Sequence, residues 1–130
     1  MHIDHINIKA PHDMLSKLKA FYCDLFDLNV GFRPVFNSNS QGFWLYYNSN
    51  ALIHLTESLS ECSSNKDNHL DHIAFQITGL SDFILILKRM GIDYTVDNLL
   101  KIGMTQLFFS DPVGNGLEAN FVNEIVSSDF

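Results

Sequence analysis

Two segments of similar pattern decide the fold: residues 2–9 read HIDHINIK and residues 70–78 read LDHIAFQIT. Both alternate polar and aliphatic residues, which is the pattern of a β-strand with one buried face. Each segment is followed by a run with helical spacing and then by three further extended runs. The chain therefore repeats one unit of a strand, a helix and three strands, and an internal repeat indicates architecture more firmly than residue propensity does.

The expected elements of the two halves match in order. The first half predicts a helix over residues 13–26 and strands over residues 3–9, 30–33, 43–47 and 52–56. The second half predicts a helix with Ser81 as its N-cap and Gly91 just past its end, and strands over residues 72–78, 92–96, 105–109 and 117–122. Residues 57–68 are rich in serine and asparagine, as in an exposed linker. We expect one domain over residues 1–130, built from modules 1–57 and 70–125.

The alternation along the strands predicts what each sheet face does. The plan is α+β, with two βαβββ modules that form a curved mixed sheet and carry their helices on the outer face. One face of the first and last strand of each half is aliphatic and suits contact with a helix. The opposite face carries His5 and His54 in the first half, and His72 and Glu118 in the second. The two pairs have similar sequence separations, so we expect them on equivalent strands that face a common cavity.

Charge and cysteine content limit the partners of this protein. Eight Lys and Arg against fifteen Asp and Glu give a formal net charge of −7, which repels phosphate backbones and anionic membranes. We therefore expect neither nucleic acid nor a membrane as a partner. Two cysteines are too few for a disulfide framework, and the sequence shows no secretion-signal pattern, so we expect a cytoplasmic protein. The open edges of two half-sheets predict a homodimer.

At these residues the chain resembles the vicinal oxygen chelate superfamily, which includes glyoxalase I, fosfomycin-modifying transferases, extradiol dioxygenases and bleomycin-resistance proteins. The resemblance covers nearly the whole chain and rests on five pieces in order: HIDHINIKA, LKAFYCDLFDLNVG, GFWLYYNSNALIHLTE, LDHIAFQITG and LFFSDPVGNGLEANF. It implies metal ligands on the first and last strands of each half, at the positions of His5, His54, His72 and Glu118. It also implies a small-molecule substrate that chelates the metal through two neighbouring oxygens.

The chemistry of these side chains agrees with a metal site. Two imidazoles and a carboxylate leave open coordination positions on a divalent ion, which suits Fe(II) and is also accepted by Mn, Co, Ni or Zn. We expect one such ion, held by His5, His72 and Glu118. During a reaction, a ligand such as Glu118 or the nearby His54 would move a proton. His54 has three open roles, as a fourth ligand, as a general base near neutral pH, or as a structural residue.

Strand alternation also indicates pocket residues. Trp44 and Tyr46 share one face of their strand, and Gln106 and Phe108 share one face of theirs. Aromatic strand residues usually belong to a core, but here the helices already cover the aliphatic faces, so we expect these four side chains to line a substrate pocket. Residues 111–114, which read DPVG, fit a tight turn with Pro at its second position and Gly at its fourth.

The leading hypothesis is a metal-dependent enzyme of the glyoxalase type, either a lyase or isomerase or a dioxygenase. His54 departs from the pattern of glyoxalase I, which carries an acidic or amide ligand there, and this argues against methylglyoxal as the substrate. Typical extradiol dioxygenases are longer chains, and a phosphonate such as fosfomycin favours a basic pocket that the second half does not offer. The alternative is a metal-free binding protein of the bleomycin-resistance kind, which sequesters a small ligand without reacting.

Overall fold

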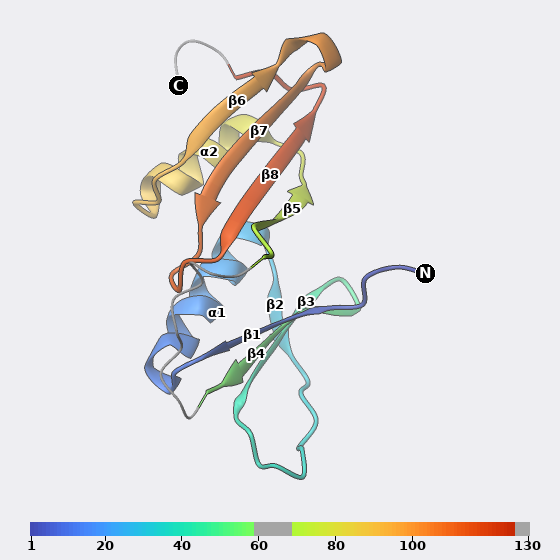
Figure 1. The fold of residues 1–130 in the computed structure, drawn as a ribbon, viewed down its shortest axis with the longest axis vertical. Helices are drawn as coiled ribbons and strands as arrows, with labels where there is room; N and C mark the ends of the chain where they lie inside the picture. The colour runs from blue at the N-terminus through green and yellow to red at the C-terminus, as the bar shows by residue number, and fades with distance from the viewer. Residues whose placement is uncertain (59–68, 127–130) are drawn as a thin grey trace. The chain divides into compact units, whose positions relative to one another are not determined.

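The structure is a computed structural model that describes residues 1–58 and 69–126. The chain divides into two compact units, Met1–Ser64 and Asn65–Phe130 (Figure 1). Most of the expected linker, from residue 59 onward, lies outside the described residues, as does Cys62. None of the helices in the described part of the chain is long and apolar enough to cross a membrane.

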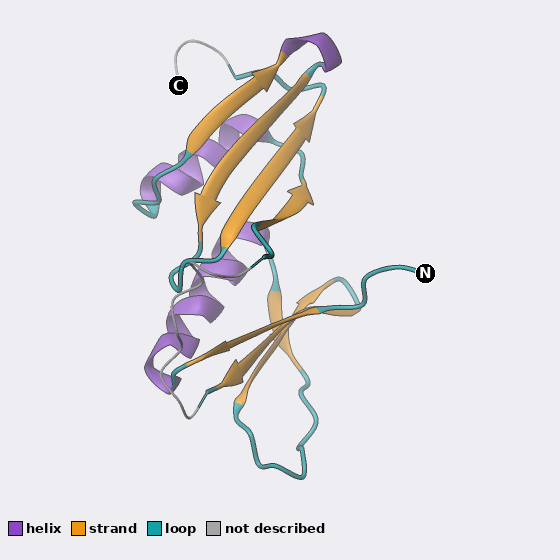
Figure 2. Cartoon of the chain, viewed as in Figure 1, coloured by secondary structure: helices purple, strands orange, loops and turns teal. Residues whose placement is uncertain are grey.

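The first unit is a four-stranded mixed sheet with one helix. Its elements, in chain order, are β1 (Ile6–Ala10), α1 (His12–Phe26), β2 (Asn29–Gly31), β3 (Gly42–Tyr47) and β4 (Asn50–Glu57). The strand order is β1-β4-β3-β2, with β1 parallel to β4 and the other neighbours antiparallel. Helix α1 covers one face of this sheet (Figure 2). Leu18 and Tyr22 of the helix are buried, as are Leu45 of β3 and Ile53 of β4 on the aliphatic face.

The second unit repeats this plan. Its elements are β5 (His72–Gln76), α2 (Leu80–Arg89), β6 (Thr95–Leu99), the short 3-10 helix η2 (Leu100–Ile102), β7 (Met104–Ser110) and β8 (Gly116–Val122). The strand order is β5-β8-β7-β6, again with the first and last strands parallel. The ring of Phe83 in α2 contacts the rings of Phe109 and Phe121, with centroids 5.9 and 5.4 Å away. The expected α+β class and the two βαβββ modules are confirmed.

The start of α2 differs from the sequence prediction. Its N-cap is Gly79, with φ 91°, and not Ser81, which lies inside the first turn. The carboxylate of Glu124 takes over the capping role, because its oxygens accept hydrogen bonds from the backbone N–H groups of Gly79 (3.0 and 3.2 Å) and Leu80 (2.9 Å). The left-handed backbone at residue 79 suits glycine, and the free N–H groups at a helix start attract an anion.

Several strand boundaries also differ from expectation, and those of β6, β1 and β2 bear on the site. Strand β6 lies at Thr95–Leu99 instead of residues 92–96, because the N–H of Ile92 still bonds the Leu87 carbonyl in the cap that follows α2. The first strand begins at Ile6, so His5 lies just before it and not within it. Strand β2 covers Asn29–Gly31, which shortens the prediction of residues 30–33 at its end.

Candidate functional site

In the first unit, three rings are stacked on the sheet face opposite α1. His54 of β4 lies between the ring of Trp44 in β3 and the ring of His5, just before β1. The ring centroids of His54 and His5 are 3.8 Å apart with 9° between the planes, and those of His54 and Trp44 are 3.9 Å apart with 12°. The register explains the stack, because Trp44 pairs with His54, and His5 lies two residues before Asn7, the partner of His54 in β1.

One nitrogen of the His54 ring is engaged by the backbone. Its Nε2 lies 3.1 Å from the carbonyl oxygen of Ala51. Since a carbonyl oxygen only accepts, Nε2 carries the hydrogen in this bond, and Nδ1 keeps the lone pair of the neutral ring. Burial, and after it the neighbouring His5, lower the pKa of His54. When the His54 ring is neutral, its basic nitrogen is therefore Nδ1.

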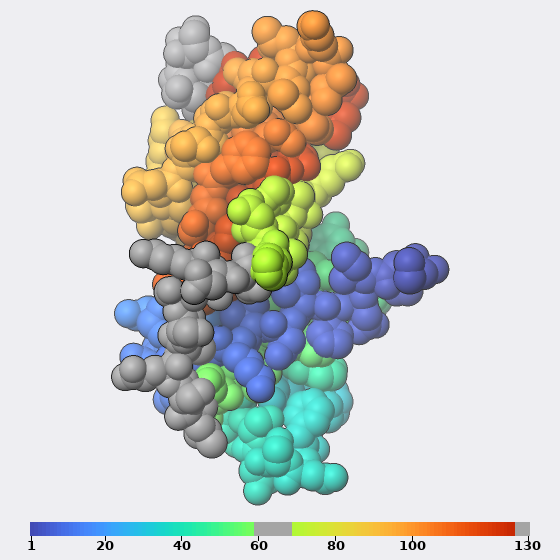
Figure 3. Space-filling model, in the orientation of Figure 1, coloured from blue at the N-terminus to red at the C-terminus, as the bar shows by residue number. Residues whose placement is uncertain are grey.

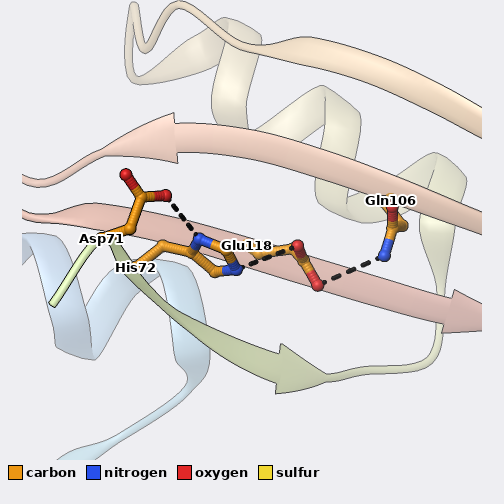
Figure 4. Close-up of polar contacts among 4 residues, drawn as sticks. All are labelled: Asp71, His72, Gln106 and Glu118. Atoms are coloured by element: carbon orange, nitrogen blue, oxygen red, sulfur yellow. Dashed lines mark hydrogen bonds and ion pairs between the residues drawn. The ribbon is translucent and has the colours of Figure 1, made fainter.

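The second unit places a buried carboxylate beside an imidazole (Figure 4). Glu118 of β8 is only 6% exposed, and its Oε1 is 3.4 Å from Nε2 of His72 in β5. The side-chain amide of Gln106 in β7 donates to the other oxygen of Glu118 at 3.4 Å. The ring of Phe108 meets the His72 ring at 87°, with centroids 6.3 Å apart. Two predicted ligands and two predicted pocket residues thus lie together in this unit.

An aspartate precedes each of the two histidines at the start of a module. Asp4 Oδ2 is 2.7 Å from Nδ1 of His5, and Asp71 Oδ2 is 2.8 Å from Nδ1 of His72. The hydrogen bond to Asp71 raises the pKa of His72, and the one to His5 lowers the pKa of Asp4. The sequence interpretation missed these aspartates. Their signal was the triplet Asp-His-Ile, which occurs in both quoted segments.

Tyr46 is the predicted pocket residue with a second, structural role. A Cβ added at Gly31 would lie 2.6 Å from its ring atoms, and Gly31 pairs in register with Trp44. The Tyr46 ring therefore lies on the Trp44 face, across β2, where a side chain at residue 31 would collide with it. Its hydroxyl donates to the carbonyl of Phe32 at 2.6 Å, which ties β3 to the chain after β2.

The DPVG segment forms the expected turn. The N–H of Gly114 bonds the carbonyl of Asp111 at 3.0 Å, and Gly114 has the positive φ of 91° that glycine accepts readily. The buried carboxylate of Asp111 accepts hydrogen bonds from the backbone N–H groups of Val113 and Asn115 at 3.0 and 2.9 Å. Asp111 thus holds the turn that leads into β8.

Each unit brings together two of the four predicted ligands: His5 with His54, and His72 with Glu118. Within either unit taken by itself, the described residues contain no group of three or more His, Cys, Asp or Glu side chains arranged to hold a metal ion.

Comparison with known proteins gives matches in structure. Neither a family model nor a curated protein sequence matches the chain. A glyoxalase family protein from Bacillus anthracis is 22% identical, with a TM-score of 0.73 over 94% of this chain and 95% of that one. A glyoxylase/bleomycin resistance protein/dioxygenase domain from Frankia sp. EAN1pec is 18% identical, with a TM-score of 0.74 over 95% and 93%. The fosfomycin resistance protein FosX from Listeria monocytogenes is 18% identical, with a TM-score of 0.70 over 93% of each chain.

These matches show that the chain has the fold of these three proteins, which is the fold that the resemblance to the vicinal oxygen chelate superfamily predicted. Related crystal structures of FosX contain Mn(II), one with sulfate and one, of a mutant, with 1S,2S-dihydroxypropylphosphonic acid. Proteins of this fold therefore include one that binds a divalent metal together with a small oxygen-rich molecule.

Proposed function

We propose that this protein is a metal-dependent enzyme of the glyoxalase type, which acts on a small substrate that chelates a divalent ion through two neighbouring oxygens. In this proposal His5, His72 and Glu118 bind the ion, and His54 is a general base. The donor set suits reactions of the lyase, isomerase or dioxygenase type.

The observation that carries this proposal is the contact between Glu118 and His72. A carboxylate that is 6% exposed loses most of its hydration, and such a group needs a compensating charge or hydrogen bonds. Among the described side chains, the basic group beside Glu118 is His72, with Nε2 at 3.4 Å, and not a lysine or arginine. A carboxylate and an imidazole nitrogen side by side are donors that Fe(II), Mn, Co, Ni and Zn all accept.

The remaining chemistry comes from residues of the chain itself. When bound, the ion would act as a Lewis acid that stabilises negative charge on a substrate oxygen. His54 can accept a proton at Nδ1, because its other ring nitrogen donates to Ala51. The rings of His5 and Trp44 on either side keep the His54 ring in this orientation. Glu118 is the second group in the proposed site that can accept a proton.

Metal titration of the metal-free protein tests the proposal. Isothermal titration calorimetry with Mn, Co, Ni, Zn and, under anaerobic conditions, Fe(II) is expected to give about one ion per chain, the stoichiometry of one ion on one set of ligands. His72→Ala and Glu118→Ala should each weaken binding by at least about tenfold. His12→Ala is the matched control, because His12 is an exposed imidazole in α1 outside the proposed site. Failure of all five ions to bind the wild-type protein would reject the enzyme proposal.

The second candidate is the metal-free sequestering protein, and one feature favours it. Two further aromatic rings extend this surface: Phe36, tilted by 49° against Trp44 with centroids 6.3 Å apart, and Phe32, which is 75% exposed. The loop that carries these residues, 32–41, lies on the molecular surface in Figure 3. Such aromatic surface suits a planar ligand, and the net charge of −7 favours a cationic one. A protein that binds no metal but binds planar cations would support this candidate.

A further inference from the structure

The same carboxylate–imidazole contact occurs at the start of both modules. Asp4 and Asp71 each bind Nδ1 of the next residue, through the same carboxylate oxygen and at nearly the same distance, 2.7 and 2.8 Å. The two histidines are also equally exposed, with 39% and 40% of the side chain accessible. The two contacts are thus one local structure that occurs twice, each time on a histidine proposed as a ligand.

This contact decides which ring nitrogen is free to bind a metal. A carboxylate only accepts hydrogen bonds, so the bonded Nδ1 must carry a hydrogen. When the ring is neutral, the lone pair is then on Nε2, and in the second module Nε2 is the nitrogen that faces Glu118. The bond also restrains rotation of the ring about its link to the backbone. Histidine ligands of metals commonly donate their other N–H to a carboxylate in this way.

The contrast with His54 supports this reading of the contact. In His54 the backbone carbonyl of Ala51 engages Nε2 instead of Nδ1. The three histidines therefore fall into two groups by hydrogen bonding: His5 and His72 present Nε2, and His54 presents Nδ1.

We propose that Asp4 and Asp71 are positioning residues, which hold His5 and His72 in the Nδ1–H form and so direct Nε2 of each ring toward the metal. The inference rests on the proposed function, since it assumes that these histidines are ligands. It adds two residues that touch neither metal nor substrate and that act through the imidazoles. Binding of the ion would replace any proton on Nε2, which passes to solvent, while the Nδ1–H bond to the aspartate stays intact.

Metal affinity gives the first test. Asp71→Ala and Asp4→Ala should each lower the metal affinity by about tenfold, which is the lower end of the usual range for a carboxylate hydrogen-bonded to a metal-binding histidine. The low end is expected because both aspartates are 84% or more exposed, so water competes for the hydrogen bond. Asp71→Asn keeps an acceptor oxygen and should lose less than Asp71→Ala. Asp93→Ala is the matched control for loss of one negative charge, because Asp93 is exposed and lies in the loop between α2 and β6.

The tautomer of the rings gives a second test that needs no metal. Long-range 15N–1H correlation spectra of the metal-free protein, recorded at a pH at which both rings are neutral, should show His5 and His72 with hydrogen on Nδ1. Asp71→Ala should move the His72 ring toward the Nε2–H form and leave His5 unchanged, and Asp4→Ala should do the reverse. The backbone amide spectrum of each variant verifies that it remains folded.

The outcomes separate this inference from the proposed function. A wild-type protein that binds metal, with alanine variants that keep both the affinity and the Nδ1–H tautomers, overturns the role of the aspartates and leaves the metal site standing. A loss in Asp93→Ala equal to that in Asp71→Ala also overturns it, because the effect would then be one of net charge. A wild-type protein that binds no metal removes the proposed function and this inference with it.

Discussion

His54 and Glu118 occupy the same position in their two sheets. His54 pairs with Asn7 and Trp44, and Glu118 pairs with Ala74 and Phe108, so each lies between a first strand on one side and an aromatic residue on the other. The two modules therefore present different chemistry at one equivalent place: an imidazole held by its backbone bond in the first, and a buried carboxylate in the second. Our proposal uses this difference, with a base in the first module and an anionic ligand in the second.

The role of His54 can be tested without a substrate. His54→Gln should leave metal affinity within about threefold of wild type, because in our proposal His54 is a base and neither a ligand nor the hydrogen-bond partner of one, whose loss typically costs tenfold or more. Calorimetric titration with the best-binding ion measures this, and His72→Gln is the matched ligand variant. A tenfold loss in His54→Gln would make His54 a fourth ligand and reject the base.

The pKa shifts of His54 and His72 predict opposite titration behaviour in the metal-free protein. Burial first, and then His5, lower the pKa of His54, whereas the hydrogen bond to Asp71 raises the pKa of His72. NMR titration of the ring signals should therefore show His54 below and His72 above the ordinary value of about 6.5. Asp71→Asn should lower the pKa of His72 and leave that of His54 unchanged. The reverse order of the two midpoints would contradict the described contacts.

The same two pKa shifts predict how the free energy of unfolding changes with pH. Between its lowered pKa and about 6.5, the His54 ring binds more protons in the unfolded chain than in the folded one. The contribution of His54 to the free energy of unfolding is therefore complete above about 6.5 and is lost as the pH falls through its lowered pKa. The contribution of His72 is complete below about 6.5 and is lost as pH rises through its raised pKa. Urea unfolding at several pH values with His54→Gln and His72→Gln measures both, since each variant should remove one slope.

The residue pattern was sufficient to predict the fold and the pairing of site residues within each unit. Strand alternation put His54 and Glu118 opposite the aliphatic residues, and the repeat put them on equivalent strands, because both signals follow from backbone geometry that the sequence must satisfy. The contacts of Asp4 and Asp71 were missed because an exposed aspartate before a strand resembles any solvated residue. The repeated triplet Asp-His-Ile was the signal for them.

A homodimer stays a prediction, and the edge strands give it a structural test. Strands β2 and β6 are edges of their sheets, and each exposes a valine, Val30 at 50% and Val96 at 41%. Unpaired edges of this kind readily pair with another chain. Light scattering at micromolar concentrations should give a mass twice that of the 14.8 kDa chain.

A lysine introduced into an edge strand tests whether that strand forms the dimer interface. Lysine on an edge strand opposes pairing with another chain, so Val96→Lys should give the monomer mass if β6 is the interface, and Val30→Lys should do so if β2 is. Each variant is the control for the other. A wild-type mass equal to one chain would contradict the dimer, and with it a metal site shared between two chains.

The capping of α2 by Glu124 predicts a loss of stability that the sequence pattern alone would assign to Ser81. Glu124→Ala leaves the N–H groups of Gly79 and Leu80 without their carboxylate, which should lower the free energy of unfolding by about 1–2 kcal/mol. Ser81→Ala should change it by less than about 0.5 kcal/mol, because Ser81 is exposed and is not the N-cap. Glu124→Gln keeps one acceptor oxygen and should fall between the two. Urea unfolding followed by circular dichroism measures all three variants. A larger loss of stability for Ser81→Ala than for Glu124→Ala would indicate that Ser81 caps the helix and would contradict the contact of Glu124 with Gly79 and Leu80.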